Sequence, residues 1–322
     1  MRAAAVAHPN IALVKYWGKA DVESNLPAVG SISITLDTLT TTTRVRFDAG
    51  SDHDEFILDG RPASDERTAR AGFCLDLFRR FRPELPPAVV KSENSFPTAA
   101  GLASSASGFA ALVTAVNAVL ESPLDRDQLG EIARRCSGSS PRSLLGGFVE
   151  LALDGDATTV RPILDRGDWP LEVVIAVTST AAKKIGSTDG MELTRTTSPF
   201  YDSWVSSSPD DLAAARAAIA SRDFEALAMV AEASCLSMHA VAMAARPGLI
   251  YWNATTVECL HRVRDLRSEG SPVFFTIDAG PQVKAICEPG SSDPVAAALA
   301  EIPGVVEIVR CGLGDGARAV ED

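Results

Sequence analysis

A run of small residues spans positions 97–106, Pro-Thr-Ala-Ala-Gly-Leu-Ala-Ser-Ser-Ala, between an expected strand and an expected helix. Small side chains let a backbone approach a ligand closely, and a helix start presents free N–H groups that favour phosphate. Ser104 and Ser105 could add hydroxyl groups to a phosphate or to Mg²⁺. A tight turn with close helix packing explains the same residues equally well, and the Gly-Lys-Ser/Thr of a Walker loop is missing.

Two further segments carry cationic groups at positions suited to anions. Residues 10–19 end an apparent first strand with Lys15, Tyr16 and Lys19, of which Tyr16 and Lys19 could hold an anion. A strand end with solvated lysines is the alternative there. Residues 137–143 place Arg142 among serines, and arginine binds carboxylate or phosphate through two parallel hydrogen bonds. A serine-rich loop with a surface arginine is the alternative for this segment.

An aspartate follows an apolar strand in the run Phe-Phe-Thr-Ile-Asp-Ala-Gly-Pro at residues 274–281. A carboxylate at a strand end is partly shielded from water, so its surroundings can tune its basicity. Asp278 is therefore a candidate acid–base or electrostatic group. The alternative is an aspartate that caps the Gly-Pro turn.

The elements that must position these residues change in character along the chain. Alternation of β-branched and polar residues predicts strands, and apolar residues at fourfold spacing predict helices. Strands are expected at residues 31–47, 55–60, 89–93, 144–153, 171–177, 272–277, 283–288 and 305–309. Helices are expected at residues 63–82, 104–120, 129–136, 210–220, 224–245, 249–269 and 294–301. A strand-rich first half and a helix-rich second half predict two α+β domains with a cleft between them.

Composition narrows the class of protein. Thirty Lys and Arg against 42 Asp and Glu give a net charge of -12, which disfavours nucleic acid or an anionic membrane as the main partner. The six cysteines form no C-x-x-C pair and no zinc-like cluster with histidine, so we expect reduced thiols. The N-terminus does not resemble a signal peptide, and no apolar run reaches bilayer length. A cytoplasmic protein is expected.

Taken together, the four segments resemble the mevalonate diphosphate decarboxylases, which belong to the galactokinase, homoserine kinase, mevalonate kinase and phosphomevalonate kinase superfamily. Residues 10–19, 96–107, 137–148 and 275–281 fit this family in order, and so do Lys183-Lys184, Ser187, Gly190-Met191 and residues 237–240. The resemblance implies a two-domain α+β fold of the small-molecule kinases with a cleft between the domains. Residues 1–182 would form an ATP-binding domain like ribosomal protein S5 domain 2. Residues 183–322 would form a helix-rich, ferredoxin-like domain whose last segment can return to the first.

The same resemblance implies an activity: mevalonate 5-diphosphate and ATP, with Mg²⁺, give isopentenyl diphosphate, ADP, phosphate and CO₂ in the mevalonate route to isoprenoids. A homodimer is implied as well. Asp278 would lie at the 3-hydroxyl as base or orienting group, Arg142 would hold the substrate carboxylate, and Lys15 would offset charge at the transferring phosphoryl group. The implied substrate contacts also include Tyr16, Lys19, Ser137, Ser139 and Ser187. The implied nucleotide contacts are Pro97, Ala99, Ala100, Gly101, Leu102, Ala103, Ser104, Ser105 and Lys184, with Ser104 and Ser105 nearest the metal.

Three places depart from the family pattern. Ala28-Val29-Gly30 replaces an asparagine or serine pair, Pro141 replaces a small residue, and Thr188 stands where many bacterial members have an arginine that helps to bind the diphosphate. The departures at Thr188 and at Ala28-Val29-Gly30 keep mevalonate 5-phosphate open as the substrate. Phosphorylation without decarboxylation is disfavoured by Arg142 beside Asp278. An inactive ligand-binding homologue is disfavoured because the catalytic set is complete.

Overall fold

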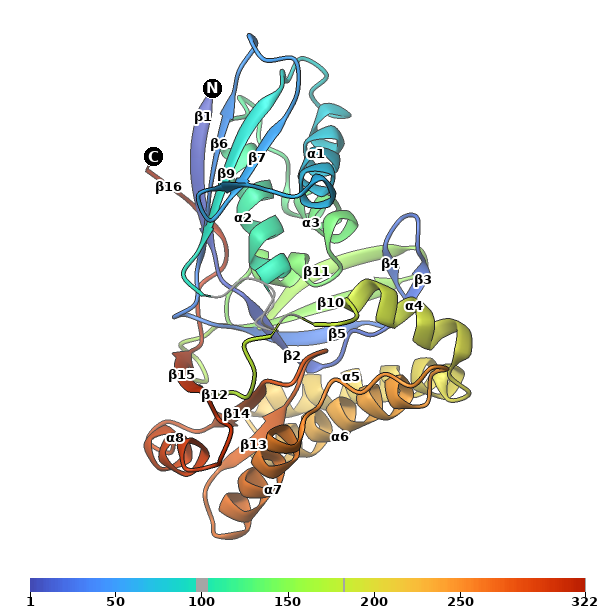
Figure 1. The fold of residues 1–322 in the computed structure, drawn as a ribbon, viewed down its shortest axis with the longest axis vertical. Helices are drawn as coiled ribbons and strands as arrows, with labels where there is room; N and C mark the ends of the chain where they lie inside the picture. The colour runs from blue at the N-terminus through green and yellow to red at the C-terminus, as the bar shows by residue number, and fades with distance from the viewer. Residues whose placement is uncertain (97–103, 182, 322) are drawn as a thin grey trace.

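A six-stranded sheet forms the upper part of the molecule in Figure 1, and it joins the two ends of the chain. The computed structural model describes residues 1–96, 104–181 and 183–321. In sheet order the strands are β16 (Arg318–Val320), β1 (Arg2–Ala7), β6 (Thr41–Phe47), β9 (Ala88–Asn94), β7 (Glu55–Leu58) and β8 (Arg61–Pro62). Pairing is antiparallel except between β7 and β9. The β16–β1 pair places the last residues of the chain beside the first.

Three helices lie on one side of this sheet, and the third of them packs on the first two rather than on the sheet's strands. They are α1 (Asp65–Arg79), α2 (Ser104–Ala118) and α3 (Arg126–Cys136). Their apolar side chains, such as Phe78 and Val113, form one buried cluster with Val45 of β6 and Val90 of β9. Helix α3 begins at a capping box in which Asp125 and Gln128 satisfy each other's backbone N–H groups.

A second sheet lies in the middle of the molecule (Figure 1). Its order is β11 (Ala157–Leu164), β10 (Phe148–Asp154), β5 (Ser31–Thr35) and β2 (Asn10–Val14), and all its pairs are antiparallel. Strands β2 and β5 are buried along their whole length. Beyond β2 the chain forms a hairpin of β3 (Lys19–Asp21) and β4 (Leu26–Pro27).

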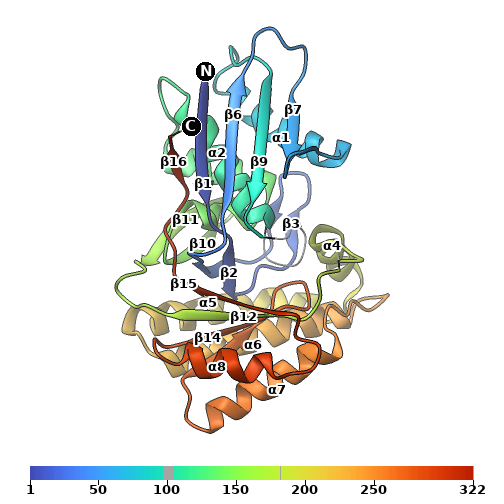
Figure 2. The ribbon, with the colours of Figure 1, turned by 60° about the vertical axis from the view of Figure 1, so that its left-hand side comes forward.

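The lower part of the molecule is a third, antiparallel sheet between two helical layers (Figures 1 and 2). Its order is β13 (Val273–Thr276), β14 (Val283–Cys287), β12 (Glu172–Val177) and β15 (Glu307–Gly312). Helices α5 (Tyr201–Ser221) and α6 (Phe224–Met243) fill the space between this sheet and the β2–β5 pair. Helices α7 (Ala254–Ser268) and α8 (Ser292–Ala300) cover the other face. Helix α4 (Ser187–Thr197) and the 3₁₀ helix η1 (Ser140–Leu144) complete the described elements.

Most expected elements occur within a few residues of their predicted bounds, but three boundaries were wrong. Helix α5 begins at Tyr201 and continues through Pro209, because a proline removes only one helical hydrogen bond and the buried Trp204 anchors the preceding turn. Helix α7 begins at Ala254 rather than 249, because the Asn253 side chain caps it. The strand expected from residue 144 begins at Phe148, after η1 and two glycines.

Other elements were not predicted, and one prediction remains untested. Strand β11, strand β16 and helix α4 had no counterpart among the expected elements. The boundary between domains at residues 182 and 183 stays a prediction, although β12 before it pairs with β14 and β15 after it. In the described part of the chain, α6 is long and apolar enough to cross a membrane by length and composition, and 56% of its apolar window is buried within the molecule.

Candidate active site

Residues from both halves of the chain line one cavity of about 570 Å³. Its wall contains the three predicted catalytic residues: Lys15 just after β2, Arg142 in η1 and Asp278 just after β13. The other predicted site residues on this wall are Tyr16, Lys19, Ser105, Ser137, Ser139 and Ser187. Thr188, the departure from the family pattern, lines it as well. The fold thus brings five segments that are distant in sequence to one place.

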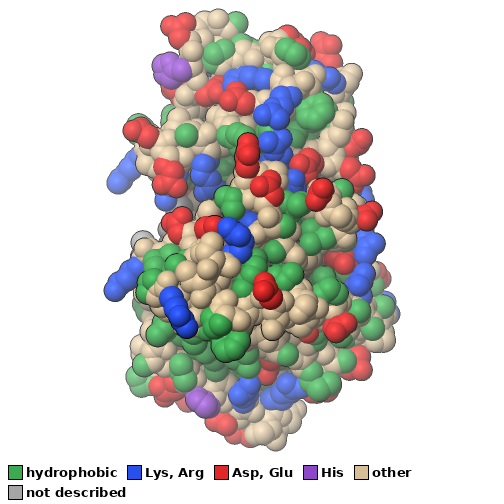
Figure 3. Space-filling model, turned by 90° about the vertical axis from the view of Figure 1, so that its right-hand side faces the viewer, with side chains coloured by type: hydrophobic (Ala, Val, Ile, Leu, Met, Phe, Trp, Pro, Cys, Tyr) green, Lys and Arg blue, Asp and Glu red, His purple; other side chains and the backbone are tan. Residues whose placement is uncertain are grey.

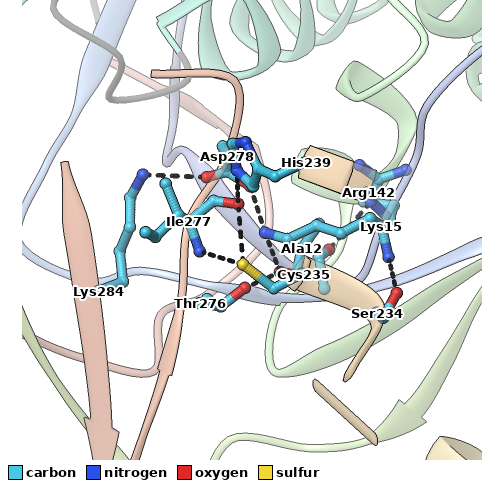
Figure 4. A network of polar contacts seen from close by, with 11 residues as sticks. Ala12, Lys15, Arg142, Ser234, Cys235, His239, Thr276, Ile277, Asp278 and Lys284 are labelled. Atoms are coloured by element: carbon cyan, nitrogen blue, oxygen red, sulfur yellow. Dashed lines mark hydrogen bonds and ion pairs between the residues drawn. The ribbon is translucent and has the colours of Figure 1, made fainter. Parts of the chain in front are cut away.

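Asp278 lies between two lysine side chains at the centre of this wall (Figure 4). The Lys15 Nζ donates a hydrogen bond of 2.8 Å to Asp278 Oδ1 and another of 2.8 Å to the backbone oxygen of Ala12. The Lys284 Nζ lies 3.2 Å from Asp278 Oδ2. Both lysine side chains are only 1% exposed, whereas Asp278 is 26% exposed and faces the cavity. The aspartate is therefore a carboxylate held between two buried cations, with one side open to a ligand.

The charge state of Asp278 follows from these neighbours. Burial by itself raises the pKa of a carboxyl group, but the charges and hydrogen bonds of Lys15 and Lys284 outweigh it and hold the pKa of Asp278 well below its usual value. Burial lowers the pKa of Lys284, and Asp278 partly offsets that effect. Asp278 is thus ionised at any working pH, and it is a much weaker base than an ordinary aspartate.

Helix α6 fixes the backbone just before Asp278. The Ile277 N–H donates to Cys235 Sγ at 3.1 Å, and the Ile277 carbonyl oxygen lies 3.3 Å from His239 Nε2. Burial, followed by the charge of Lys15, lowers the pKa of His239 to about 3, so the ring is neutral at pH 7 and can donate to that carbonyl. The position at which the carboxylate leaves the strand is therefore well defined.

Arg142 is a buried cation whose hydrogen bonds go to hydroxyl groups. Its Nη1 donates to Ser31 Oγ at 2.6 Å and its Nε donates to Ser33 Oγ at 3.2 Å, both on β5. Within the described ranges, no carboxylate forms an ion pair with it. Burial lowers its pKa to about 10, so it remains charged at neutral pH. An anionic ligand group in the cavity would supply the counter-charge that the protein leaves out.

Asn10 holds the segment that carries Arg142. Its side-chain N–H groups donate to the backbone oxygen of Ser139 at 3.0 Å and to Ser143 Oγ at 2.8 Å. Pro141 is buried at the second position of the η1 turn, so the departure from the family pattern stiffens this loop without moving Arg142 away from the cavity.

Tyr16 and Lys19 place a hydroxyl group and a cation at the buried wall of the larger cavity. The Tyr16 hydroxyl is buried and has no hydrogen-bond partner among the described residues, and burial raises its pKa to about 12. Its ring packs on Gly138, where an added Cβ would lie 2.5 Å from the hydroxyl oxygen. Lys19 is buried, and burial, with Arg70 second, lowers its pKa. A phosphate oxygen could accept hydrogen bonds from both.

A smaller cavity of about 370 Å³ adjoins the first at the start of α2. Phe56, Leu58, Val90, Phe109 and Leu112 give it an apolar wall, and Ser104 and Ser105 lie at its helix end. Arg70, Ser105, Lys183, Gly186 and Ser187 belong to both cavities. An apolar slot beside a helix start suits a flat heterocycle whose phosphate chain points into the larger cavity.

Several predicted site residues do not lie on the described walls of the two cavities. Pro97, Ala99, Ala100, Gly101, Leu102 and Ala103 lie outside the described residues. Lys184 is exposed and lies outside the described walls of both cavities, whereas Lys183 lines both. Val29 and Ala28 pack in an apolar cluster with Trp17, and an added Cβ at Gly30 would lie 2.8 Å from Leu212. This departure from the family pattern therefore serves packing.

Sequence reasoning missed Lys284 and Asn10. Lys284 is the single charged residue of the apolar strand β14, and a lysine in such a strand must find a buried partner. That signal was available in the sequence. Asn10 gave no comparable signal, because its role depends on the approach of a loop more than 120 residues away.

The side chains around the two cavities fit the binding of Mg²⁺ and ATP. In the described part of the chain, no group of three or more His, Cys, Asp or Glu side chains could hold a metal. That fits Mg²⁺, which is usually bound by one or two protein groups plus phosphate oxygens and water. The hydroxyl groups of Ser104 and Ser105 are the candidates here, and the smaller cavity fits a nucleotide.

Comparison with known proteins agrees with this geometry. Residues 7–160 match the model of the diphosphomevalonate decarboxylase-like N-terminal domain, and residues 173–308 match that of the mevalonate 5-diphosphate decarboxylase C-terminal domain. The diphosphomevalonate decarboxylase of Candida albicans is 35% identical, with 100% of this chain and 99% of that protein covered.

Solved structures are similar over the whole chain. A mevalonate diphosphate decarboxylase from Staphylococcus aureus is 35% identical with a TM-score of 0.93, covering 99% of this chain and 98% of that one. A structure described as MDDEF in complex with MVAPP, AMPPCP and magnesium is 36% identical with a TM-score of 0.92, covering 100% and 99%. Its ligands are a diphosphate substrate, a non-hydrolysable ATP analogue and the metal. With both halves matched in order and full-length relatives of the same kind, this chain belongs to the diphosphomevalonate decarboxylase family.

Proposed function

We propose that the chain catalyses the ATP-dependent decarboxylation of mevalonate 5-diphosphate to isopentenyl diphosphate, with release of ADP, phosphate and CO₂. The observation that carries this proposal is the convergence of Asp278, Lys15 and Arg142 on one cavity that adjoins a nucleotide-sized cavity. A structural relative holds the substrate, an ATP analogue and magnesium together, which supports the same ligands here.

The chemistry begins with a tertiary hydroxyl group, which is a poor leaving group. Asp278 accepts the hydrogen bond of this 3-hydroxyl and orients its oxygen toward the γ-phosphoryl group. Because the two lysines make Asp278 a weak base, its role is orientation, and the proton leaves with the phosphoryl oxygens or to water. Lys15 offsets the negative charge that develops on the transferring group.

Elimination follows phosphoryl transfer. The C3–O bond breaks with its electron pair leaving on phosphate, and the neighbouring bond to the carboxylate carbon then supplies the electron pair of the new double bond as CO₂ departs. Arg142 binds the substrate carboxylate at a charged, buried guanidinium and so fixes its orientation for this step. Its two serine partners on β5 leave the remaining donors for the ligand.

The remaining residues bind phosphates. We assign the substrate diphosphate to Tyr16, Lys19, Ser137 and Ser139, whose wall carries unmatched donors. We assign the nucleotide to the smaller cavity, with Ser104 and Ser105 at the phosphates and Ser187 and Lys183 at the junction. Mg²⁺ on the phosphates, with those hydroxyl groups, would neutralise charge on the transferring group. Lys184, exposed in this structure, remains an assignment from family resemblance.

The test is incubation of the purified protein with ATP, Mg²⁺ and each of mevalonate, its 5-phosphate and its 5-diphosphate, with ADP and CO₂ measured separately. We expect equal release of ADP and CO₂ with the diphosphate. ADP without CO₂ would show a 3-hydroxyl kinase and contradict the decarboxylase assignment.

A second candidate substrate is mevalonate 5-phosphate, and one observation favours it. Thr188 lines the cavity with a short neutral side chain, so this position contributes no charge to a second phosphate. Preferred turnover of the monophosphate in the same assay would establish it. The unsatisfied Tyr16 hydroxyl and the buried Lys19 cation keep the diphosphate as the first choice.

We also propose a cytoplasmic homodimer. Six free, buried cysteines support a reducing compartment. Acidic and basic side chains are interspersed over the face in Figure 3, and the net charge is -12, which supports a small-molecule substrate rather than nucleic acid or membrane. Exposed Phe200, Met229 and Ile250 leave apolar surface available for a subunit contact. Light scattering on the eluting protein tests the dimer, and fractionation of cells tests the compartment.

A further inference from the structure

We propose that Lys284 is a positioning residue of the reaction, which holds Oδ2 of Asp278 from behind the cavity wall while Lys15 serves both Asp278 and the reacting groups. This inference rests on the proposed function and adds a residue to it. Asp278 has two oxygens and two buried lysines, and the two lysines differ in what else they can reach (Figure 4).

The difference lies in access to the cavity. Lys15 and Asp278 line the larger cavity, whereas Lys284 is not among the described residues that line either cavity. Lys284 approaches Asp278 from β14 at 3.2 Å, and its side chain is 1% exposed. It therefore touches a catalytic group but cannot touch substrate. Removing it changes the substrate's surroundings only through Asp278.

The backbone of Lys284 is unusually well fixed for a residue near a ligand site. Strand β14 is an inner strand, and Lys284 pairs with Thr276 of β13 on one side and with Ile175 of β12 on the other. Thr276 in turn donates a hydrogen bond of 3.2 Å to the backbone oxygen of Ala12 in β2. The Lys284 ammonium group therefore extends from a strand whose neighbour β13 is hydrogen-bonded to β2, in the other half of the chain.

The charges around Lys284 show why a second cation is needed. The titratable groups that face it are Asp278, Lys15, Lys183, Cys235 and His239. His239 and Cys235 are neutral, because burial lowers the pKa of the imidazole to about 3 and raises that of the thiol. Three lysines therefore surround one carboxylate. When phosphate groups enter the cavity, they compete for Lys15, and Lys284 remains as the cation that only Asp278 can use.

Two consequences follow for the enzyme. Lys284 keeps the Asp278 carboxylate in one orientation when Lys15 shifts its interaction toward the transferring phosphoryl group. It also keeps that carboxylate ionised as the pH falls, since loss of one of two cationic partners lets burial raise the pKa of Asp278. A merely structural lysine would produce neither effect.

The experiment compares wild-type protein with Lys284→Met, which removes the charge and keeps the length of the side chain. Lys91→Met is the matched control, because Lys91 is exposed on β9 and lies outside both described cavity walls. ADP and CO₂ release are measured over the acid pH range with mevalonate 5-diphosphate. We expect kcat to fall about 10- to 100-fold, which is the usual loss when a group that orients a functional residue is removed. We expect little change in KM.

The pH profile gives the decisive result. The acid limb of kcat in Lys284→Met should lie at higher pH than in the wild-type protein, because one of the two cations that lower the pKa of Asp278 is gone. A carbon NMR titration of the Asp278 carboxyl group assigns this limb and separates it from His239. Unchanged kcat and an unmoved carboxyl titration would overturn the inference, and so would a rise in KM alone. If the methionine variant does not fold, Lys284→Gln is used, with the same shift expected.

The two proposals fail in different ways. Wild-type protein that releases no CO₂ from any of the three mevalonate compounds contradicts the proposed function. Wild-type protein that decarboxylates normally, together with a Lys284 variant of wild-type kcat and pH profile, contradicts only the role of Lys284.

Discussion

Replacing Arg142 by glutamine should remove activity and yet leave the folded protein slightly more stable. Arg142 is 2% exposed, and its protein partners are hydroxyl groups rather than carboxylates. A buried cation without a counter-charge destabilises the fold, and it is retained because a ligand uses it. The variant therefore separates the stability of the protein from its function.

The magnitude follows from the pKa. Burial lowers the Arg142 pKa to about 10 from an ordinary value of about 12.5, which corresponds to about 3 kcal/mol against the charged form at every pH below 10. Glutamine removes this penalty but weakens the hydrogen bonds to Ser31 and Ser33, at about 1 kcal/mol each. The free energy of unfolding should rise by about 1 kcal/mol and the Tm by about 2 °C.

Activity should change in the opposite direction. The substrate carboxylate loses a charge-assisted contact, and about 3 kcal/mol of lost interaction lowers kcat/KM by about 100-fold. Calorimetry measures Tm, and CO₂ release at several substrate concentrations measures kcat/KM. Arg82→Gln is the control, since Arg82 lines neither described cavity wall and its side chain binds backbone oxygens. A large fall in Tm would make Arg142 a structural cation, and an unchanged kcat/KM would place the carboxylate elsewhere.

Three further changes test other parts of the site. Asp278→Asn should lower kcat by at least about 1,000-fold while binding of an ATP analogue survives; a wild-type rate would make the aspartate structural. Gly138→Ala adds a Cβ 2.5 Å from the Tyr16 hydroxyl oxygen, so KM for the diphosphate should rise about tenfold with KM for ATP unchanged, and equal changes in both would contradict a diphosphate site there. The depressed pKa of His239 means that the unfolded chain takes up its proton first, so the free energy of unfolding should fall as pH drops from about 6.5 toward 3. In His239→Gln, the free energy of unfolding measured in urea should fall less steeply as the pH drops. A pH dependence identical to that of the wild-type protein would refute this.

The sequence predicted the elements that have strong local signals. The alternating run at residues 31–47, the strand expected at 89–93 and the helices expected at 63–82 and 104–120 match β5, β6, β9, α1 and α2. Elements fixed by distant contacts were missed. Helix α5 continues through Pro209 because Trp204 donates to the backbone oxygen of Trp17, and β16 forms because β1 is available beside it. Neither partner is visible in a local window.

The candidate site divides in the same way. The sequence identified individual residues that could bind anions or act in catalysis, but each also had a purely structural explanation. Only the family resemblance assigned them to one site. Their relation in space could not be predicted from local pattern. The pairing of Asp278 with both Lys15 and Lys284 depends on β2, β13 and β14 meeting. Of the two roles expected for the aspartate, base or orienting group, this pairing favours the second.

The distribution of charge explains why such a site suits an anionic substrate. The chain carries a net charge of -12, yet Lys15, Lys19 and Arg142 are all buried at one cavity, and only Lys15 among them pairs with Asp278. Burial disfavours the charged forms of Lys19 and Arg142 in the empty protein, and carboxylate and phosphate groups of a ligand would offset that cost. Binding energy from those anionic ends can then hold the neutral 3-hydroxyl group at Asp278, in the orientation that phosphoryl transfer needs. The cations that bind the carboxylate and the phosphates of the substrate thereby position its 3-hydroxyl group, which has no charge of its own.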